Sequence, residues 1–252
     1  MPTVHFYGKV LPSSTHLTII PIPDIKTDIL PLGLQMTFTI NIQDCSIDMV
    51  CEINKLPMEH FASIHARALD MCRGAIDIFS FSTGVGLTTI LEYFVHEDGS
   101  QSPILGNHEY LKPLCTAYSL NDGITSAQIR EFVLKNHELY MALNDLIMAI
   151  TIPQDLRMNC GRALDGIRRL IGGADAEKAW PKVQTALRAD RAYLKFITDN
   201  ARGQRHGEHR NLQGEMAVEL LTRSWILMNR YFEYLKRKQQ PLPETEFPLL
   251  KG

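Results

Sequence analysis

Residues 35–53 read QMTFTINIQDCSIDMVCEI, and this stretch decides the class of the N-terminal half of the chain. Apolar and polar residues alternate in Gln35–Ile42 and again in Ser46–Ile53. A period of two is typical of half-buried strands, so the pattern predicts two strands joined by a short hairpin turn at Gln43–Cys45. The alternating apolar positions are Met36, Phe38, Ile40 and Ile42 in the first strand and Ile47, Met49, Cys51 and Ile53 in the second.

Further elements are expected on both sides of this hairpin. Val4–Val10 and Leu87–His96 have the pattern and composition of strands. Leu11–Leu34 contains four prolines, which exclude a helix and restrict strands there to sheet edges or short segments. Pro57 opens a predicted helix whose apolar residues fall three and four positions apart. Residues 1–120 are therefore predicted to form a mixed α/β module with antiparallel strands.

The second half of the chain has the apolar spacing of helices. Four helices with short connections are typical of an all-α bundle. The predicted helices are Ala127–Ile150, Pro153–Ile171, Asp175–Asn200 and Gly214–Lys238. Gly203 and Gly207 predict a loop before the last helix, and Pro241 ends that helix. The expected fold is α+β, in which the module precedes a four-helix bundle at residues 121–240 and a tail at residues 241–252.

Composition limits the classes of protein to which the chain can belong. Of its 252 residues, 45% are hydrophobic and 21% are charged, which excludes a disordered chain and a coiled-coil rod. No stretch approaches the roughly 18 uninterrupted apolar residues of a membrane-spanning helix, and Met1–Val10 lacks the pattern of a secretory signal. The five cysteines form no C-x-x-C pair, which favours free thiols. We therefore expect a cytoplasmic protein without a membrane segment.

Charge is distributed unevenly along the chain. Residues 1–150 hold 8 Lys and Arg against 16 Asp and Glu, whereas residues 151–240 hold 17 against 10. A basic module attracts polyanions such as nucleic acid. The alternatives are that the acidic half docks on the basic half, or that the charges are solvated helix faces.

Residues 199–210 read DNARGQRHGEHR and place three arginines and two histidines between the last two predicted helices. Histidine suits proton transfer because its unperturbed pKa of about 6.5 lies near neutral pH. Arginine stays charged, and its planar fork binds phosphate oxygens in pairs. RNA carries its own nucleophile, the 2′-hydroxyl, so these two residue types can cleave RNA without a metal ion.

This segment and the helices around it resemble the HEPN family of nucleotide-binding and ribonuclease domains. The resemblance covers residues 125–238. It implies an all-α bundle that forms a homodimer and, in ribonuclease members, an R-x(4–6)-H motif near the junction of the last two core helices. Many members act in bacterial defence or toxin–antitoxin systems, and the resemblance implies such a role here.

Carried over residue by residue, the motif begins at Arg202. His209 completes R-x6-H, while His206 lies one residue short of the family spacing but precedes Gly207, as the histidine of the family often does. Gly203 stands where active members often carry a polar residue. The resemblance implies no metal ion and no cofactor, a homodimer formed through the bundle, and the following site: catalytic Arg202, His206 and His209, and nucleic-acid-binding Arg205 and Arg210.

Two other functions fit the same sequence. A bundle of this kind can bind a nucleotide or RNA without cleaving it and act as a regulator. It can also be a protein-interaction module, in which the segment at residues 199–210 is a solvated loop between helices. A ribonuclease needs Arg202 and a histidine exposed in an open cleft, whereas burial of these side chains against acidic residues favours the alternatives.

Overall fold

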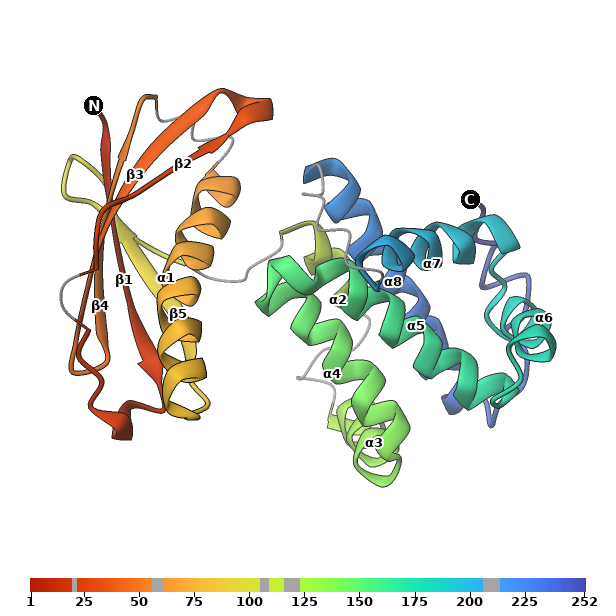
Figure 1. Cartoon of the computed structure of the whole chain (residues 1–252). Coiled ribbons are helices and arrows are strands. Elements are labelled where there is room, and N and C mark those ends of the chain that lie inside the picture. The colour runs from red at the N-terminus through yellow and green to blue at the C-terminus, as the bar shows by residue number, and fades with distance from the viewer. Residues whose placement is uncertain (20–21, 56–60, 105–108, 116–122, 206–213) are drawn as a thin grey trace. The chain divides into compact units, whose positions relative to one another are not determined.

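The computed structural model describes residues 1–19, 22–55, 61–104, 109–115, 123–205 and 214–252 (Figure 1). The chain divides into two compact units, Met1–Leu105 and Gly106–Gly252. The first unit is built on an antiparallel sheet and the second is helical, which confirms the expected α+β class. The second unit begins earlier than residue 121, because Glu109–Cys115 belong to it.

The N-terminal unit contains one six-stranded sheet with the strand order β2-β3-β4-β1-β5-β6. All its strand pairs are antiparallel. Its elements are β1 (Thr3–Leu11), β2 (Ile25–Ile29), β3 (Leu34–Gln43), β4 (Ser46–Ile53), α1 (Phe61–Thr83), β5 (Thr88–Val95) and β6 (Gln101–Pro103), with short 3-10 turns at Ser13–Thr15 and Leu30–Leu32. The short β2 lies at one edge of the sheet, as the prolines around it predict.

The predicted hairpin is confirmed as β3 and β4. Gln43 pairs with Ser46, which leaves Asp44 and Cys45 as the two turn residues. Both have positive φ, 47° and 64°, as tight hairpin turns that match the twist of their strands require. A residue outside the hairpin also holds the turn, because the backbone N–H of Cys45 donates to the carbonyl of Leu17 at 2.8 Å.

Helix α1 supplies the core of the N-terminal unit and lies alongside the sheet (Figure 1). The residues of α1 that have no exposed surface repeat every four positions, so they form one stripe. They pack with the inward residues of β1, β3 and β4. The stripe consists of Ile64, Ala68, Cys72 and Ile76. The rings of Phe6, Phe61 and Phe94 close one end of the core, with the centres of Phe61 and Phe94 4.0 Å apart.

The C-terminal unit is built around one central helix. Its elements are α2 (Lys112–Cys115), α3 (Gly123–Lys135), α4 (His137–Thr151), α5 (Leu156–Gly172), α6 (Ala176–Leu187), α7 (Arg191–Arg205) and α8 (Gly214–Lys236), with 3-10 turns at Glu109–Leu111 and Pro153–Asp155. Helix α5 packs against α4, α6, α7 and α8. Its buried apolar residues, among them Leu164 and Ile167, lie in the core that these helices share.

Two of the four predicted helices are each divided in two, which corrects the four-helix expectation. Asn136 separates α3 from α4 with extended backbone, and its side chain accepts the backbone N–H of Leu139 at 3.1 Å. Arg188, in left-handed conformation, ends α6, and Asp190 accepts the backbone N–H of Tyr193 at 2.7 Å. Apolar spacing continues across both breaks, so the capping residues rather than the periodicity set the helix ends.

The predicted tail, residues 241–252, is part of the fold. Leu242 is buried, and the N–H of Leu250 donates to the carbonyl of Arg188 at 2.9 Å. Arg230, buried on α8, donates to the carbonyls of Leu187 and Arg188, both at 2.8 Å, and to that of Pro248 at 2.6 Å. One guanidinium therefore ties this C-terminal strap to the corner between α6 and α7.

Four cysteines, Cys45, Cys51, Cys72 and Cys160, are buried and unpaired. Burial raises the pKa of Cys51 and of Cys72 to about 12, so both thiols stay protonated at neutral pH. Among the described helices, none combines the length and the apolar character needed to cross a membrane.

Gly8 and Gly74 form a matched pair of tests for the N-terminal unit. A Cβ at Gly8 would overlap the carbonyl oxygen of Ile90 on β5, whereas a Cβ at Gly74 on α1 meets nothing within 4 Å. We expect Gly8→Ala to lower the free energy of unfolding by about 1–3 kcal/mol. Gly74→Ala should raise it by about 0.5–1 kcal/mol because alanine is the better helix former. Chemical denaturation followed by circular dichroism measures both, and equal effects would contradict the register of β1 on β5.

Arg230 provides the test for the C-terminal strap. Arg230→Met removes the hydrogen bonds from this side chain to three carbonyl oxygens, so we expect the free energy of unfolding to fall by about 2–4 kcal/mol and the strap to be released. Limited proteolysis should then cleave within residues 241–252. The exposed Lys251→Met is the control and should behave as wild type. A strap as resistant in Arg230→Met as in wild type would show that other contacts hold it.

Candidate functional site

Arg202 lies near the end of α7, and its side chain is exposed. Gly203 is also helical, so it does not begin a loop as the sequence predicts; α7 continues to Arg205. The side chain of Arg205 lies outside the described residues, as do His206, Gly207, His209 and Arg210. The structure thus places Arg202 and leaves the other predicted site residues as predictions.

Helix α7 is strongly amphipathic, and this explains the exposure of Arg202. Its buried side chains belong to the core of the C-terminal unit. They are Tyr193, Leu194, Ile197 and Ala201, spaced three and four apart. The opposite face carries exposed Arg191, Lys195, Asp199 and Arg202 at the same spacing. Packing of the apolar stripe therefore turns Arg202 towards solvent.

The end of α7 that carries Arg202 is attached to α5. The Nε of Arg157, in the first turn of α5, donates to the carbonyl of Asn200 at 2.8 Å. The side-chain amide of Asn200 donates in turn to the carbonyl of Phe196 at 2.8 Å. Both acceptors are backbone carbonyls in the second half of α7, and the bond from Arg157 joins this part of the helix to α5. The hydrogen bonds of Arg157 and Asn200 therefore hold the part of α7 that carries Arg202.

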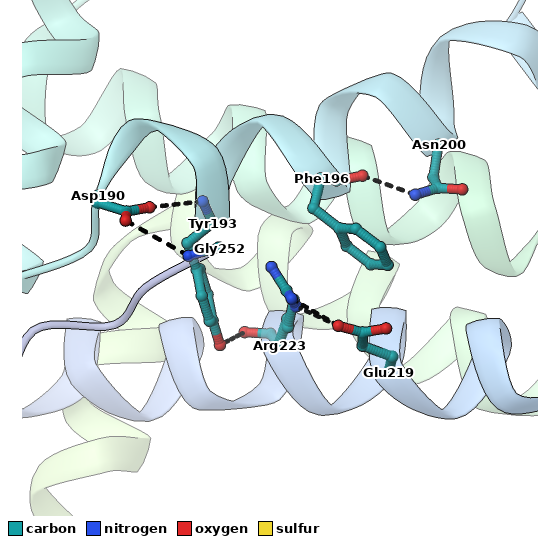
Figure 2. Close-up of polar contacts among 7 residues, drawn as sticks. All are labelled: Asp190, Tyr193, Phe196, Asn200, Glu219, Arg223 and Gly252. Carbon is teal, nitrogen blue, oxygen red and sulfur yellow. Dashed lines mark hydrogen bonds and ion pairs between the residues drawn. The ribbon is translucent and has the colours of Figure 1, made fainter.

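A second set of contacts attaches α7 to α8 (Figure 2). The guanidinium of Arg223 lies over the rings of Phe196 and Tyr193, with Cζ 4.2 and 4.9 Å from the ring centres. Its Nε donates to Oε1 of Glu219 at 3.0 Å. The hydroxyl of Tyr193 donates to the carbonyl of Arg223 at 3.3 Å. Cation–π contacts of this kind are stronger in a site with little water.

Burial sets the protonation state of this contact. It raises the pKa of Tyr193 to about 12 although the nearby charge of Arg223 opposes the shift, so the phenol remains a donor at neutral pH. The Nη1 of Arg223 is buried without a hydrogen-bond partner in the described part of the chain. The rings of Phe196 and Tyr193 therefore take the place of hydrogen-bonding partners for part of this cation.

The start of α7 is fixed as firmly as its end. Asp190 caps the helix through Oδ1, and its Oδ2 accepts the backbone N–H of Gly252 at 3.4 Å (Figure 2).

Only part of these contacts can be predicted from the sequence. Glu219 and Arg223 lie four apart on one helix, a spacing that predicts their ion pair, but nothing in the sequence predicts that two rings from another helix lie beside Arg223. Sequence reasoning therefore missed Arg157, Arg223 and the two rings that Arg223 contacts.

The arrangement supports binding of anions at the exposed face of α7. Arg202 forms no ion pair or hydrogen bond with any described residue, so its fork is available for a phosphate. The C-terminal unit carries 21 Lys and Arg against 17 Asp and Glu, and the N-terminal unit 5 against 11. Within the described part of the chain, no group of three or more His, Cys, Asp or Glu side chains gathers as a metal site would need.

Arg223→Ala tests the contact between α7 and α8. It removes the cation from two rings and frees Glu219, so we expect the free energy of unfolding of the helical unit to fall by about 1–3 kcal/mol. Arg223→Lys keeps the charge but not the planar fork, and should recover only part of this loss. Thermal unfolding measures both, beside Arg130→Ala, an exposed arginine on α3. Wild-type stability of Arg223→Ala would show that the contact does not hold the helices together.

Comparison with known proteins agrees with the division into two units. Residues 4–105 match the model of the N-terminal domain of DUF8168, a domain of unknown function, and residues 126–236 match the model of the C-terminal domain of the same family. No curated protein and no solved structure matches the chain. The two descriptions name no activity, so the HEPN resemblance stays a prediction. Because both domain models match in their order along the chain, the protein belongs to the DUF8168 family.

Proposed function

We propose that the C-terminal unit is a metal-independent endoribonuclease that acts on RNA through Arg202 and a histidine, His206 or His209. One observation supports this more than any other. Arg202 is exposed at the end of α7, has no partner among the described residues, and is followed within a few positions by both histidines. The resemblance to HEPN proteins extends the proposal to a homodimer formed through the helices and to a role in defence or a toxin-like system.

The proposed reaction needs only groups that the chain and the RNA supply. A neutral histidine takes the proton of the 2′-hydroxyl, and the 2′-oxygen attacks the adjacent phosphorus. The bond from phosphorus to the 5′-oxygen breaks, and the protonated histidine returns its proton to that oxygen. The products are a 2′,3′-cyclic phosphate and a 5′-hydroxyl. Arg202 stabilises the extra negative charge on the phosphoryl oxygens.

A second function is favoured by Gly203. This residue follows Arg202 directly, where active HEPN members often carry a polar residue, and in this chain it is helical. A domain that holds RNA or a nucleotide through Arg202 without cleaving it fits the same exposed face. It would act as a binding or regulatory protein.

The test is cleavage of a labelled, mixed-sequence single-stranded RNA by the full chain in EDTA. We expect wild type to give 2′,3′-cyclic phosphate ends and Arg202→Ala to be at least about 100-fold slower, because a preorganised charge at the phosphoryl group is lost. His206→Ala and His209→Ala identify the histidine, since only the one that transfers the proton should lose activity.

The control is Arg130→Ala, which removes an equally exposed arginine from α3 and should cleave as wild type does. Circular dichroism confirms that each variant is folded. If the wild-type protein binds the RNA but leaves it intact, the ribonuclease proposal is wrong and the binding protein is supported instead. Cleavage that survives Arg202→Ala would exclude Arg202 from the site.

A further inference from the structure

We propose that the groove between α6 and α7 binds single-stranded RNA, with one base stacked on Trp180 and the strand running along α7 towards Arg202. This inference rests on the proposed function for its ligand. It does not need cleavage, so binding experiments separate the two.

The groove has the size and lining of a small ligand site. Its volume is about 490 Å3, and residues of both helices line it. The apolar part comes from Trp180 and Pro181 on α6 and from Leu194 on α7. The polar part of the lining comes from both helices, namely Arg191, Lys195, Thr198 and Asp199 of α7 and Glu177 and Gln184 of α6. An aromatic surface beside cations is the combination that unpaired nucleotides need.

Trp180 is held in place before any ligand binds. The ring is half-buried, and the guanidinium of Arg168 lies 5.7 Å from its centre. Arg168 is itself buried on α5, where its Nε lies 3.5 Å from Asp165 and its Nη1 donates to the carbonyl of Gly173 at 3.4 Å. A ring fixed in this way loses little conformational freedom when a base stacks on it.

The polar face of α7 connects the groove with Arg202. Arg191, Lys195, Asp199 and Arg202 follow one another at helical spacing on the exposed face. The Nζ of Lys195 lies 3.7 Å from Asp199, so these two charges compensate each other in part. Arg191 and Arg202 have no ion-pair partner among the described residues. The two available cations thus stand at the two ends of the face.

The distance between these cations suits a short stretch of nucleic acid. Arg191 and Arg202 are eleven residues apart, which corresponds to about 16 Å along the helix axis. An extended strand whose phosphates contact both cations begins at the groove, which Arg191 lines, and runs along α7 to Arg202. One base can then enter the groove and stack on Trp180.

The geometry favours a single strand over a duplex. Bases in a duplex are paired and stacked on each other, so their faces are not free to stack on a ring that lines a groove. Two carboxylates of the lining, Glu177 and Asp199, can accept hydrogen bonds from amino groups of a base, which a bare phosphate does not offer. The same groove therefore distinguishes an unpaired nucleotide from a simple anion.

The experiment measures binding to the full chain by fluorescence anisotropy. The probe is a fluorescein-labelled, mixed-sequence single strand of 2′-O-methyl RNA, which lacks the 2′-hydroxyl and cannot be cleaved. Trp180→Leu keeps an apolar side chain but removes the stacking surface, and we expect about 10-fold weaker binding. Trp180→Phe keeps an aromatic ring and should bind more tightly than Trp180→Leu. This difference would show that the weaker binding comes from lost stacking and not from unfolding.

Arg191→Gln adds a readout that a structural effect does not change. Loss of one phosphate contact should weaken binding and reduce the slope of log affinity against log salt by about 0.7, whereas Trp180→Leu should leave the slope unchanged. The control is Lys182→Gln, an exposed cation of α6 that does not line the groove and should bind as wild type does.

The outcomes separate this inference from the proposed function. Weaker binding by Trp180→Leu and Arg191→Gln supports the groove, even if wild type cleaves no RNA. Wild-type affinity in both variants overturns the groove, even if Arg202 proves essential for cleavage. Equal affinity for a duplex of the same sequence overturns the preference for single strands. Absence of RNA binding by the wild-type protein overturns both the proposed binding groove and the proposed ribonuclease.

Discussion

Close packing around α5 is the constraint on which the helical unit depends. A Cβ at Gly166 would lie 2.8 Å from the Cβ of Ala142, so α4 approaches α5 as nearly as backbones allow. At the other end, Gly172 leaves no room for a Cβ beside Ala179 of α6. On either side of Gly166, α5 buries Leu164 and Ile167 in the shared core, each worth about 1.5–3 kcal/mol. The helix therefore determines where α4, α6, α7 and α8 can lie.

The candidate site follows from this arrangement. Helix α7 must turn Ile197 and Ala201 towards the core, and helical geometry then leaves Arg191, Lys195 and Arg202 outside. Arg157 of α5 binds the second half of α7, and Arg223 of α8 contacts Tyr193 and Phe196 in its first half. A polar face held by contacts from two other helices is a rigid platform, which suits recognition of a ligand better than a loop does.

Sequence patterns predicted the parts of the fold that depend on local periodicity. Alternation in 35–53 gave β3, β4 and their turn, because a strand buried on one face must alternate. The breaks at Asn136 and Asp190 were missed although both are good capping residues, because apolar spacing on either side serves one common core. The sequence alone does not show whether a capping residue ends a helix or the apolar spacing continues it, because this depends on which helices pack together.

Features that join distant segments could not be predicted. Arg230 donates to three carbonyls, two at the end of α6 and one in the strap. All three are far from Arg230 in the sequence, so no local pattern around α8 predicts these bonds. The groove beside Trp180 exists only because α6 and α7 lie next to each other. The sequence placed Arg202 in a loop, because Gly203 and Gly207 favour one, whereas the structure places it within α7.

Photocrosslinking tests most directly whether RNA lies on the exposed face of α7. The full chain is irradiated with single-stranded RNA that contains 4-thiouridine, and the crosslinked peptides are identified by mass spectrometry. We predict crosslinks in residues 177–202, with Trp180 or its neighbours among them, and their loss when unlabelled single-stranded RNA competes. Crosslinks confined to the N-terminal unit, or spread over both units without competition, would contradict the account.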